Sequence, residues 1–182
     1  SWLPISDEMV RTHAEVFSDG RLRLPYRLEL LHPDAEPIDS CVELLGRYGL
    51  SVISDIDDTI KHTQVTDRKA MLANTFLRPF RPVPGMAALY RRAADGGAVF
   101  HYVSGSPWQL FGPLEAFRRH ERFPAGSFHL KHFRLKDSSA ANLLGSQEDY
   151  KAGHIEPILA AFPHRRFLLV GDSGEQDPEI YG

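Results

Sequence analysis

Cysteine is almost missing from this 182-residue sequence, which contains Cys41 alone. A single cysteine excludes an internal disulfide framework and fits a reducing compartment. No apolar run approaches the length of a membrane-spanning helix, and the start SWLPISDEMV has none of the apolar character of a signal peptide. Internal repeats and low-complexity tracts are also missing. These absences, with 42% hydrophobic and 25% charged residues, favour a globular cytoplasmic protein of ordinary domain size.

The net charge of −3 conceals an uneven distribution along the chain. Residues 1–60 hold 12 Asp and Glu against 5 Arg, whereas residues 61–92 hold 7 Lys and Arg against Asp67 alone. The second block is interleaved with apolar residues, including Phe76, Leu77 and Phe80. Such a mixture indicates either an anionic, partly apolar partner or an ordinary helix with one core face and one solvated basic face.

Residues 1–49 are expected to form a small β-rich segment. Residues 14–17 and 21–24 flank an Asp-Gly turn, which is the pattern of a β-hairpin. The following stretch is expected to be broken into loops or edge strands by three prolines, Pro25, Pro33 and Pro37. No group of residues in this segment indicates chemistry.

Residues 50–182 alternate between short apolar stretches and helical patterns. This alternation predicts an α/β fold, a Rossmann-like three-layer sandwich with a mostly parallel sheet. Strands are expected at about 50–55, 98–103, 127–130 and 166–170. Helices are expected at about 66–77, 85–95, 107–122 and 150–162, the last with Lys151 in its first turn.

The strand at 50–55 ends in a group of carboxylates, Asp55, Asp57 and Asp58. Alternation along an extended chain would place Asp55 and Asp57 on one side. Ligands of open α/β sheets collect outside the carboxyl ends of the strands, so the position suits a site. Two close carboxylates at low dielectric need a compensating cation, for which Mg²⁺ is the first candidate because it prefers hard oxygen ligands. The alternative is an acidic turn that only solubilises the end of the strand.

Polar residues also follow two other expected strands. Ser104-Gly105-Ser106-Pro107 is expected to turn into a helix, with Ser106 as its N-cap and backbone N–H groups open to an anion. Asp172 and Asp177 follow the strand at 166–170. Together these strand ends predict a metal and anion site along one edge of the sheet. Two nearby histidines without acidic or cysteine partners, His129 and His132, are interpreted as packing or loop residues rather than zinc ligands.

The motifs carry a resemblance to a known family. Asp55-Ile56-Asp57-Asp58-Thr59 resembles the D-x-D-x-T signature of the haloacid dehalogenase superfamily of phosphatases, and Ser104, Lys151 and Gly171-Asp172 with Asp177 resemble its other three motifs in order. More narrowly, the segments SDIDDTIKHTQV, NTFLRPFRPVPGM, HYVSGSPWQL, FPAGSFHL and LLVGDSGEQDPEIY resemble the actin-patch-associated, lipin-like phosphatidate phosphatases. The resemblance covers residues 50–182, which are expected to be the phosphatase domain. It also implies a further helix and strand after the fourth motif, so the sequence is expected to stop short of a complete domain.

The resemblance implies a mechanism and a role for each motif residue. Asp55 would be the nucleophile that forms an aspartyl-phosphate, and Asp57 would be the general acid and base, with a raised pKa because it is crowded by negative charge. Thr59, Ser104 and Lys151 would order the site or contact the phosphoryl oxygens. Mg²⁺ would be held by the Asp55 carboxylate, the Asp57 backbone carbonyl and Asp172, with Asp177 as a direct or indirect ligand.

Three functions stay open from the sequence. The first is a Mg²⁺-dependent phosphatidate phosphatase that contacts membranes peripherally through residues 61–92, with no nucleic-acid partner. The second is a phosphatase of a soluble phosphomonoester, such as a nucleic-acid end or a sugar phosphate. The third is a non-catalytic module that binds anionic lipid. The paired Asp55 and Asp57 speak against the third function, because a module that only binds has no need of Asp57.

Overall fold

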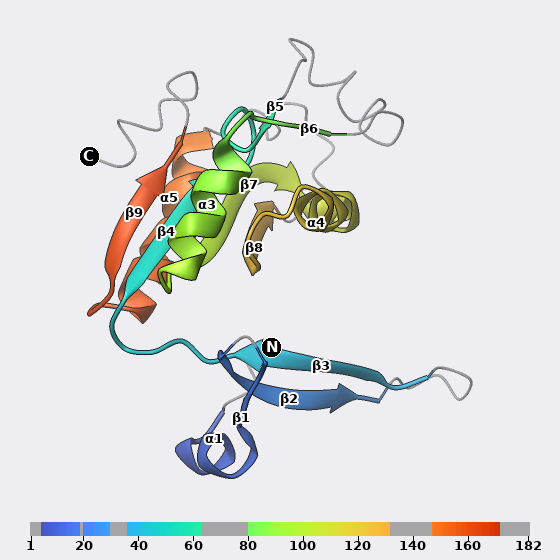
Figure 1. The fold of residues 1–182 in the computed structure, drawn as a ribbon, viewed down its shortest axis with the longest axis vertical. Helices are drawn as coiled ribbons and strands as arrows, with labels where there is room; N and C mark the ends of the chain where they lie inside the picture. Colours follow the sequence, from blue (N-terminus) through green and yellow to red (C-terminus); the bar gives the residue numbers. More distant parts are fainter. Residues whose placement is uncertain (1–4, 19, 30–35, 63–79, 132–146, 172–182) are drawn as a thin grey trace. The chain divides into compact units, whose positions relative to one another are not determined.

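The computed structural model describes residues 5–18, 20–29, 36–62, 80–131 and 147–171, with residues 147–152 described by their backbone alone. The chain divides into two compact units, Ser1–Arg47 and Tyr48–Gly182. The first unit contains helix α1 (Asp7–His13) and strands β1 (Glu15–Val16), β2 (Leu22–Leu28) and β3 (Ile38–Glu43). The second unit contains the other elements (Figure 1).

The first unit is built on an antiparallel sheet in the order β1-β2-β3. Glu15 pairs with Arg23 and Val16 with Leu22, which confirms the hairpin predicted around the Asp-Gly turn. Pro25 lies inside β2, opposite Cys41 of β3. Proline is tolerated there because β1 stops pairing at Arg23, so that β2 has an open edge on that side among the described residues.

The second unit is organised around a parallel sheet in the order β8-β7-β4-β9. Its strands are β4 (Leu50–Asp55), β7 (Val99–Pro107), β8 (Gly126–Lys131) and β9 (Arg166–Val170). β4 pairs in parallel with β7 and with β9, and β7 pairs in parallel with β8. These pairings confirm the predicted α/β fold and place the expected strands in one sheet. In chain order the sheet runs 3-2-1-4, so its order reverses beside β4, which is the position where doubly wound folds bind ligands.

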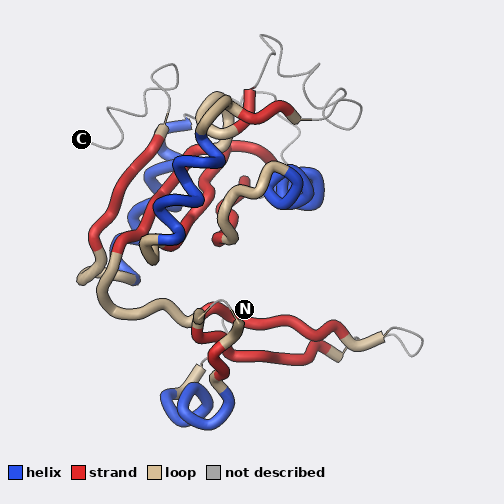
Figure 2. The backbone as a smooth tube through the Cα atoms, viewed as in Figure 1, coloured by secondary structure: helices blue, strands red, loops and turns tan. Residues whose placement is uncertain are grey.

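Helices cover both faces of the parallel sheet and complete three layers (Figure 2). On one face, α3 (Met86–Asp95) and α4 (Phe111–His120) pack on a core that includes Val52, Phe100 and Tyr102. On the other face, α5 (Gln147–Ala161) packs on Ile53 and Val103 through Ile155 and Ile158. β4 is buried on both faces, which explains its short continuous apolar run.

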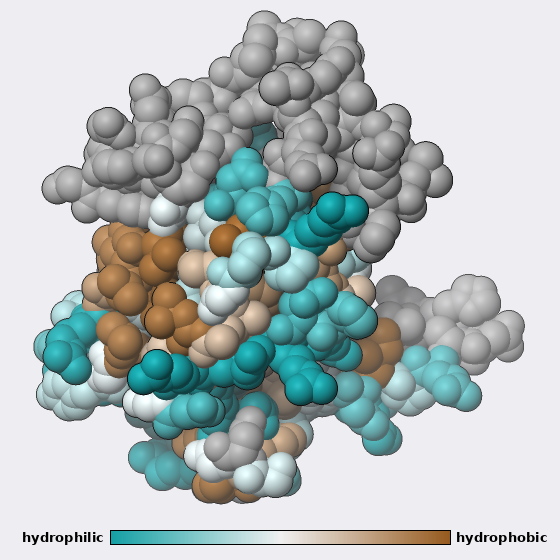
Figure 3. Space-filling model, turned by 45° about the horizontal axis from the view of Figure 1, so that its top comes forward, coloured by the Kyte–Doolittle hydropathy of each residue, from teal (hydrophilic) through white to brown (hydrophobic). Residues whose placement is uncertain are grey.

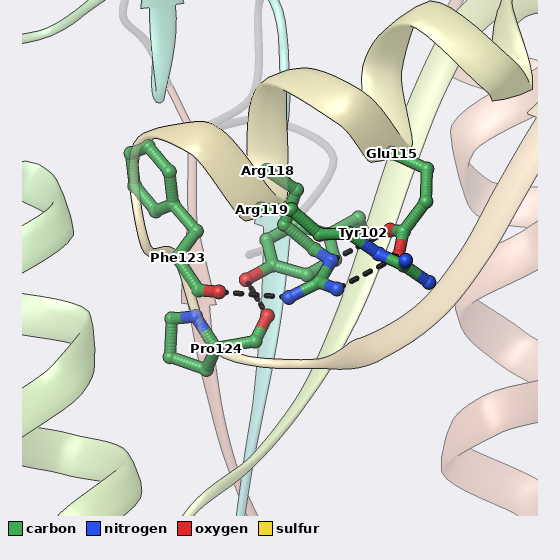
Figure 4. Close-up of polar contacts among 6 residues, drawn as sticks. All are labelled: Tyr102, Glu115, Arg118, Arg119, Phe123 and Pro124. Carbon is green, nitrogen blue, oxygen red and sulfur yellow. Dashed lines mark hydrogen bonds and ion pairs between the residues drawn. The ribbon is translucent and has the colours of Figure 1, made fainter.

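A polar network secures the connection from α4 to β8 (Figure 4). Arg118 donates hydrogen bonds to both Glu115 carboxylate oxygens and to the Phe123 carbonyl, at 2.6 to 2.8 Å. The buried Tyr102 hydroxyl donates to the Pro124 carbonyl at 2.9 Å. Burial raises the pKa of Tyr102, so this phenol stays a hydrogen-bond donor. The network therefore fixes the tight turn before β8 against the centre of the sheet.

A two-stranded ribbon, β5 (Lys61–His62) and β6 (Arg81–Pro82), lies beyond the carboxyl end of β4 (Figure 1). Lys61 pairs with Pro82 and His62 with Arg81, so the two ends of the 63–79 connection leave from the same place. The expected helix at 66–77 falls outside the described residues. No helix in the described ranges is long and apolar enough to cross a membrane.

Apolar surface is exposed on the β9 side of the parallel sheet. Leu168 of β9 is 51% exposed, and it shares a sheet face with Val52, its partner on β4. Figure 3 shows this apolar surface at the left, the side on which Figure 1 draws β9. Among the described elements, α3 and α4 pack over the middle of that face and leave its β9 edge uncovered.

Three predicted element boundaries are wrong. β7 continues through Pro107, and the chain then enters a 3₁₀ turn (Trp108–Leu110) before α4, so Ser106 is not a helix N-cap. The cause is the longer pairing of β7 with β8, which reaches Pro107 and Lys131 through a register shift. α5 begins at Gln147, so Lys151 lies in the second turn of that helix rather than the first. The predicted helix of residues 85–95 is confirmed as α3, with Gly85 before it and Gly96 after it.

Candidate active site

Asp55 is the last residue of β4 and is 1% exposed. The preceding Ser54 hydroxyl donates a hydrogen bond to the Asp55 carbonyl and lies 2.8 Å from the Tyr90 hydroxyl of α3. Burial, and next the charge of Asp55, raise the pKa of Tyr90 to about 12, although its hydrogen bond with Ser54 acts in the opposite sense. Tyr90 therefore stays protonated at neutral pH and supports the strand end as a hydrogen-bonding group, not as an acid or base.

The chain turns sharply after Asp55, so the alternation expected for the acidic residues does not continue. Asp58 has a left-handed backbone (φ 56°), and its N–H donates to the Lys61 carbonyl at 2.7 Å. Lys61 N–H in turn donates to the Ile56 carbonyl at 3.1 Å. Ile56 is buried while Asp58 is exposed, although alternation would place both on one side. The turn thereby directs Asp58 to solvent and leaves Asp55 and Asp57 as the acids of the site.

Asp57 is held by three side chains from two other segments. Its Oδ2 accepts hydrogen bonds from Ser104 Oγ at 2.9 Å and from Ser106 Oγ at 3.3 Å. Its Oδ1 forms an ion pair with Lys61 Nζ at 2.7 Å. The Asp57 side chain keeps 13% of its surface exposed, so it is held in place but still accessible to a ligand. Asp57 and Ser104, which the sequence predicted as residues of one site, are therefore in direct contact in the structure.

Ser104 and Ser106 belong to the end of β7 and not to a helix N-terminus. The Ser106 N–H donates to Ser104 Oγ at 2.9 Å, so it is not offered to an anion as the sequence suggested. Ser104 is fully buried and Ser106 is 3% exposed. The two serines therefore orient the Asp57 carboxylate through hydrogen bonds to its Oδ2 atom.

The other predicted site residues are placed to different extents. Thr59 is 5% exposed in the turn after Asp57, and its Oγ1 has no hydrogen-bond partner among the described residues. The backbone of Lys151 lies in α5, and its side chain is outside the description. Asp172 and Asp177 lie outside the described residues as well.

Three contributors were not predicted from the sequence: Lys61, Ser106 and Tyr90. Lys61 was counted among the basic residues of the 61–92 block, yet it is 4% exposed and turned toward Asp57. The available signal was its place four residues after Asp57, within the same motif. Tyr90 gave no signal, because a tyrosine on an apolar helix face is ordinarily a core residue.

The oxygen donors at the end of β4 are of the kind that Mg²⁺ prefers. The described residues contain no cluster of three His, Cys, Asp or Glu side chains able to hold a metal. They do supply a buried hard carboxylate, Asp55, and a backbone carbonyl of Asp57, whose carboxylate is already engaged by Lys61 and Ser104. Val170 pairs with Ser54, so β9 ends beside the end of β4, and Asp172 and Asp177 follow β9 in the sequence. Oxygen donors at this edge fit a hard divalent cation.

One surface hollow among the described residues does not coincide with this site. It has a volume of about 370 Å³ and lies between the start of α3 and the end of α4, near Pro84, Arg91 and His120. None of the predicted site residues lines it. The residues at the end of β4 therefore identify the candidate site better than the position of this surface hollow does.

Comparison with known proteins identifies a family and relatives of this chain. Residues 50–182 match the family model described as "Phosphatidate phosphatase APP1, catalytic domain". The chain is 39% identical over 153 residues to "Phosphatidate phosphatase APP1" of Saccharomyces cerevisiae, covering 81% of this chain and 26% of the relative. It is 33% identical over 144 residues to "Uncharacterized protein C29B5.04c" of Schizosaccharomyces pombe, covering 77% of this chain and 23% of the relative. The chain spans about a quarter of the length of the curated relatives that it matches.

The matched region begins at Leu50, the first residue of β4, and so includes the strand end, the clamped Asp57 and the serines of β7. It covers well over half of the chain. The chain belongs to the family of the phosphatidate phosphatase APP1 catalytic domain.

Proposed function

We propose that this chain carries a Mg²⁺-dependent phosphatase domain that hydrolyses phosphatidate to diacylglycerol and phosphate through an aspartyl-phosphate. The observation that carries the proposal is the pairing of a buried Asp55 at the end of β4 with an Asp57 clamped by Lys61 and Ser104. Two carboxylates with different surroundings, two residues apart, suit two different roles in one reaction. The family and the name of the yeast relative support phosphatidate as the substrate.

In the first step, an Asp55 carboxylate oxygen attacks the phosphorus, and the bond from phosphorus to the glycerol oxygen breaks. Asp57 gives a proton to the departing alkoxide, so diacylglycerol leaves as a neutral alcohol. The Lys61 ion pair and the hydrogen bonds from the two serines favour the ionised form of Asp57. The negative charge of the bound phosphate acts in the opposite sense and favours the protonated form for this step. The result is an acyl phosphate on Asp55.

In the second step, Asp57 takes a proton from a water molecule that attacks the same phosphorus. The bond to Asp55 breaks, which restores the carboxylate and releases inorganic phosphate. Mg²⁺, held by the Asp55 carboxylate, the Asp57 carbonyl, Asp172 and Asp177, would neutralise charge on the phosphoryl oxygens. Lys151 would meet the same oxygens, and Thr59 and Ser104 would order the site.

Peripheral contact with a lipid surface is proposed for the 61–92 block. The β5–β6 ribbon brings both ends of the 63–79 connection to the carboxyl end of β4, where the substrate would bind. Arg81 and Arg92 are exposed, whereas Lys61 is buried against Asp57 and does not count toward a lipid-facing charge. Each basic residue near an anionic bilayer contributes about 1 kcal/mol, so three or four would suffice for localisation.

The decisive experiment measures phosphate release from phosphatidate in detergent micelles and from a panel of soluble phosphomonoesters, with Mg²⁺ and with a chelator. We expect Mg²⁺-dependent release that strongly favours phosphatidate. Asp55→Asn should lower turnover by roughly 10³-fold or more, because the amide cannot form the phospho-enzyme. Near-normal activity of Asp55→Asn would overturn the covalent mechanism, and faster release from a soluble ester would overturn the lipid substrate.

A second measurement isolates the membrane contact. The variant with Arg68, Lys69, Arg78 and Arg81 changed to Ser should lose activity on phosphatidate vesicles and depend less on salt, while it keeps turnover of a small soluble ester. The first three of these residues lie outside the described ranges. Equal loss on both substrates would mean that the block supports the fold instead.

A further inference from the structure

Lys61 is a cation built into the interior beside the candidate site. The residue is 4% exposed and its side chain 5% exposed, and its Nζ lies 2.7 Å from Asp57 Oδ1. The same Nζ lies 4.6 Å from the centroid of the Phe80 ring, a cation–π distance. Burying an ammonium costs several kcal/mol unless it is paired. Both the ion pair and the ring contact offset that cost, so this placement is specific.

The contacts to Asp57 are divided between its two oxygen atoms. Lys61 binds Oδ1, while Ser104 and Ser106 bind Oδ2. The three donors come from β5, which follows the turn that carries Asp57, and from β7, which pairs with β4. A carboxylate held at both oxygens from separate strands has one allowed orientation of its side chain. This is the geometry expected for a group that must meet a reacting atom within a fraction of an ångström.

The position of Lys61 also limits what else it can do. Its ammonium is enclosed by Asp57 and by Phe80, which directly precedes β6. Its backbone is pinned by two hydrogen bonds in the turn, from Lys61 N–H to the Ile56 carbonyl and from Asp58 N–H to the Lys61 carbonyl. The side chain is therefore anchored at its root and at its tip, with its charge directed at Asp57.

We propose that Lys61 is a positioning residue that acts through Asp57, with Phe80 as its support, and that it is not a phosphate-binding lysine. This inference rests on the proposed function, since it presumes that Asp57 transfers protons. Lys61 holds Oδ1 so that Oδ2, on the side of Ser104 and Ser106, keeps a fixed direction for proton transfer. Loss of Lys61 leaves the acid in place but lets its side chain rotate.

The test compares Lys61→Met with the wild type in the Mg²⁺-loaded protein. A mispositioned acid should lower kcat on phosphatidate by about 10- to 100-fold with KM changed less than about two-fold, because misplacement of a catalytic group costs about this much without altering ground-state binding. A lysine that bound the phosphate would raise KM as well. Phe80→Leu, which removes the ring but not the charge, should show the same pattern at about a two- to five-fold loss, in line with the modest strength of a cation–π contact.

A double-mutant cycle identifies the route of the effect. If Lys61 acts through Asp57, adding Lys61→Met to Asp57→Asn should cost less than about two-fold more, because the two changes remove one function. Multiplicative losses would overturn the inference. Arg119→Met is the matched control, because Arg119 is exposed on α4 and paired with Glu115, away from the site. It should leave kcat and KM unchanged.

The outcomes separate this inference from the proposed function. If Asp57→Asn keeps its activity, the assigned acid and base role fails, whatever Lys61 does. If Asp57→Asn is inactive while Lys61→Met and Phe80→Leu are as active as the wild type, the proposed function stands and the positioning role of Lys61 is wrong. If Lys61→Met does not fold, a lower kcat at unchanged KM in Phe80→Leu supports positioning through the Lys61–Asp57 pair, and a wild-type kcat overturns the supporting role of Phe80.

Discussion

The parallel and antiparallel sheets of this chain use strands of similar length but bury them very differently. Five of the six residues of β4 are buried, whereas Leu24 is the one buried residue of the seven in β2. β4 has helices on both faces, so each of its side chains meets a core. In the antiparallel sheet, the registers Leu24 with Val42 and Leu28 with Ile38 gather apolar residues on one face.

The opposite face of the antiparallel sheet gathers charge. The same ladder pairs Arg27 with Asp39 and Arg23 with Glu43. These charges pair with one another near the surface, whereas two buried charges of the second unit, Asp55 of β4 and Lys61 of β5, lie at the carboxyl end of β4, where the ligands of such sheets collect. The comparison teaches that two of the buried charges, Asp55 and Lys61, gather at the candidate site, while the charges of the antiparallel sheet pair with one another. A third buried charge, Arg165, instead holds the start of β4 through Ser51 and the Leu50 carbonyl.

The largest effect on stability is expected at Gly126, the first residue of β8. A Cβ built there would lie 2.4 Å from the Phe100 carbonyl oxygen and 3.0 Å from Phe100 Cβ. Because these atoms belong to the central strand β7 and cannot swing away, Gly126→Ala should cost about 3 kcal/mol or more in the free energy of unfolding. The measurement is urea unfolding of the purified variant.

Gly112 in α4 is the matched control for this change. A Cβ at Gly112 meets nothing within 4 Å, so Gly112→Ala should stabilise the protein by about 1 kcal/mol through helix propensity. Opposite signs for the two substitutions would confirm that the parallel sheet is packed without spare room at β8. A small loss of unfolding free energy in Gly126→Ala would show that β7 and β8 can move apart. That result would contradict the close packing described for the parallel sheet.

A somewhat smaller effect is expected from the buried histidine of β7. His101 is 5% exposed, and its Nδ1 lies 2.8 Å from Ser127 Oγ. Burial, and then the charges of His129 and Arg165, lower the pKa of His101 to about 4. The folded state thus resists a proton that the unfolded chain accepts near pH 6.5. The contribution of His101 to the free energy of unfolding is therefore fully present above that pH and is lost as the pH drops toward 4. The loss from this group is about 2 kcal/mol between pH 7 and 5.

Replacing His101 with Gln keeps a hydrogen-bonding side chain near Ser127 and removes the titration. His101→Gln should flatten the fall in unfolding free energy between pH 7 and 5 by about 2 kcal/mol. His120→Gln is the control, because the His120 side chain is 85% exposed. The unfolding free energy of this variant should change with pH as that of the wild type does. Burial lowers the pKa of His129 as well, so a residual slope in the same direction is expected. Equal slopes for wild type and His101→Gln would refute the assignment.

The sequence predicted the parallel sheet well because its signals are local. Short β-branched runs such as Val52-Ile53 read as buried strands, and Gly85 and Gly96 bounded α3 closely. It predicted poorly where pairing across the sheet decided the outcome. β7 runs past Ser104 to Pro107 because β8 continues beside it, and no local pattern shows that. The sequence therefore indicated a helix start where the structure has a strand end.

The candidate site shows the same limit. Asp55, Asp57 and Ser104 were predicted from motif order, and the contact of Ser104 with Asp57 follows from strands that meet at one edge. Lys61 was missed because charge alone assigned it to solvent, while its burial depends on the turn at Asp58 and on Phe80, nineteen residues later in the sequence. A composition count cannot separate a buried cation from an exposed one.

The smallest effect is expected in the antiparallel sheet, at the ion pair between Arg27 and Asp39. Arg27 Nε lies 2.7 Å from Asp39 Oδ1 and its second nitrogen 3.0 Å from Oδ2, but the two side chains are 62% and 69% exposed. The hydrogen bond to Arg27 lowers the pKa of Asp39, so any gain is present above the pKa of the unfolded carboxyl and fades as the pH falls. Solvent and salt screen such a pair, so Asp39→Asn should leave the thermal midpoint unchanged within error.

Glu115→Gln in α4 is the comparison, because the Glu115 side chain is 20% exposed and orients Arg118 against the Phe123 carbonyl. After allowance for its partial exposure, Glu115→Gln should cost about 1 kcal/mol. If Asp39→Asn proved as costly as Glu115→Gln at 0.15 M and at 1 M NaCl, exposure would not be what separates the two sheets.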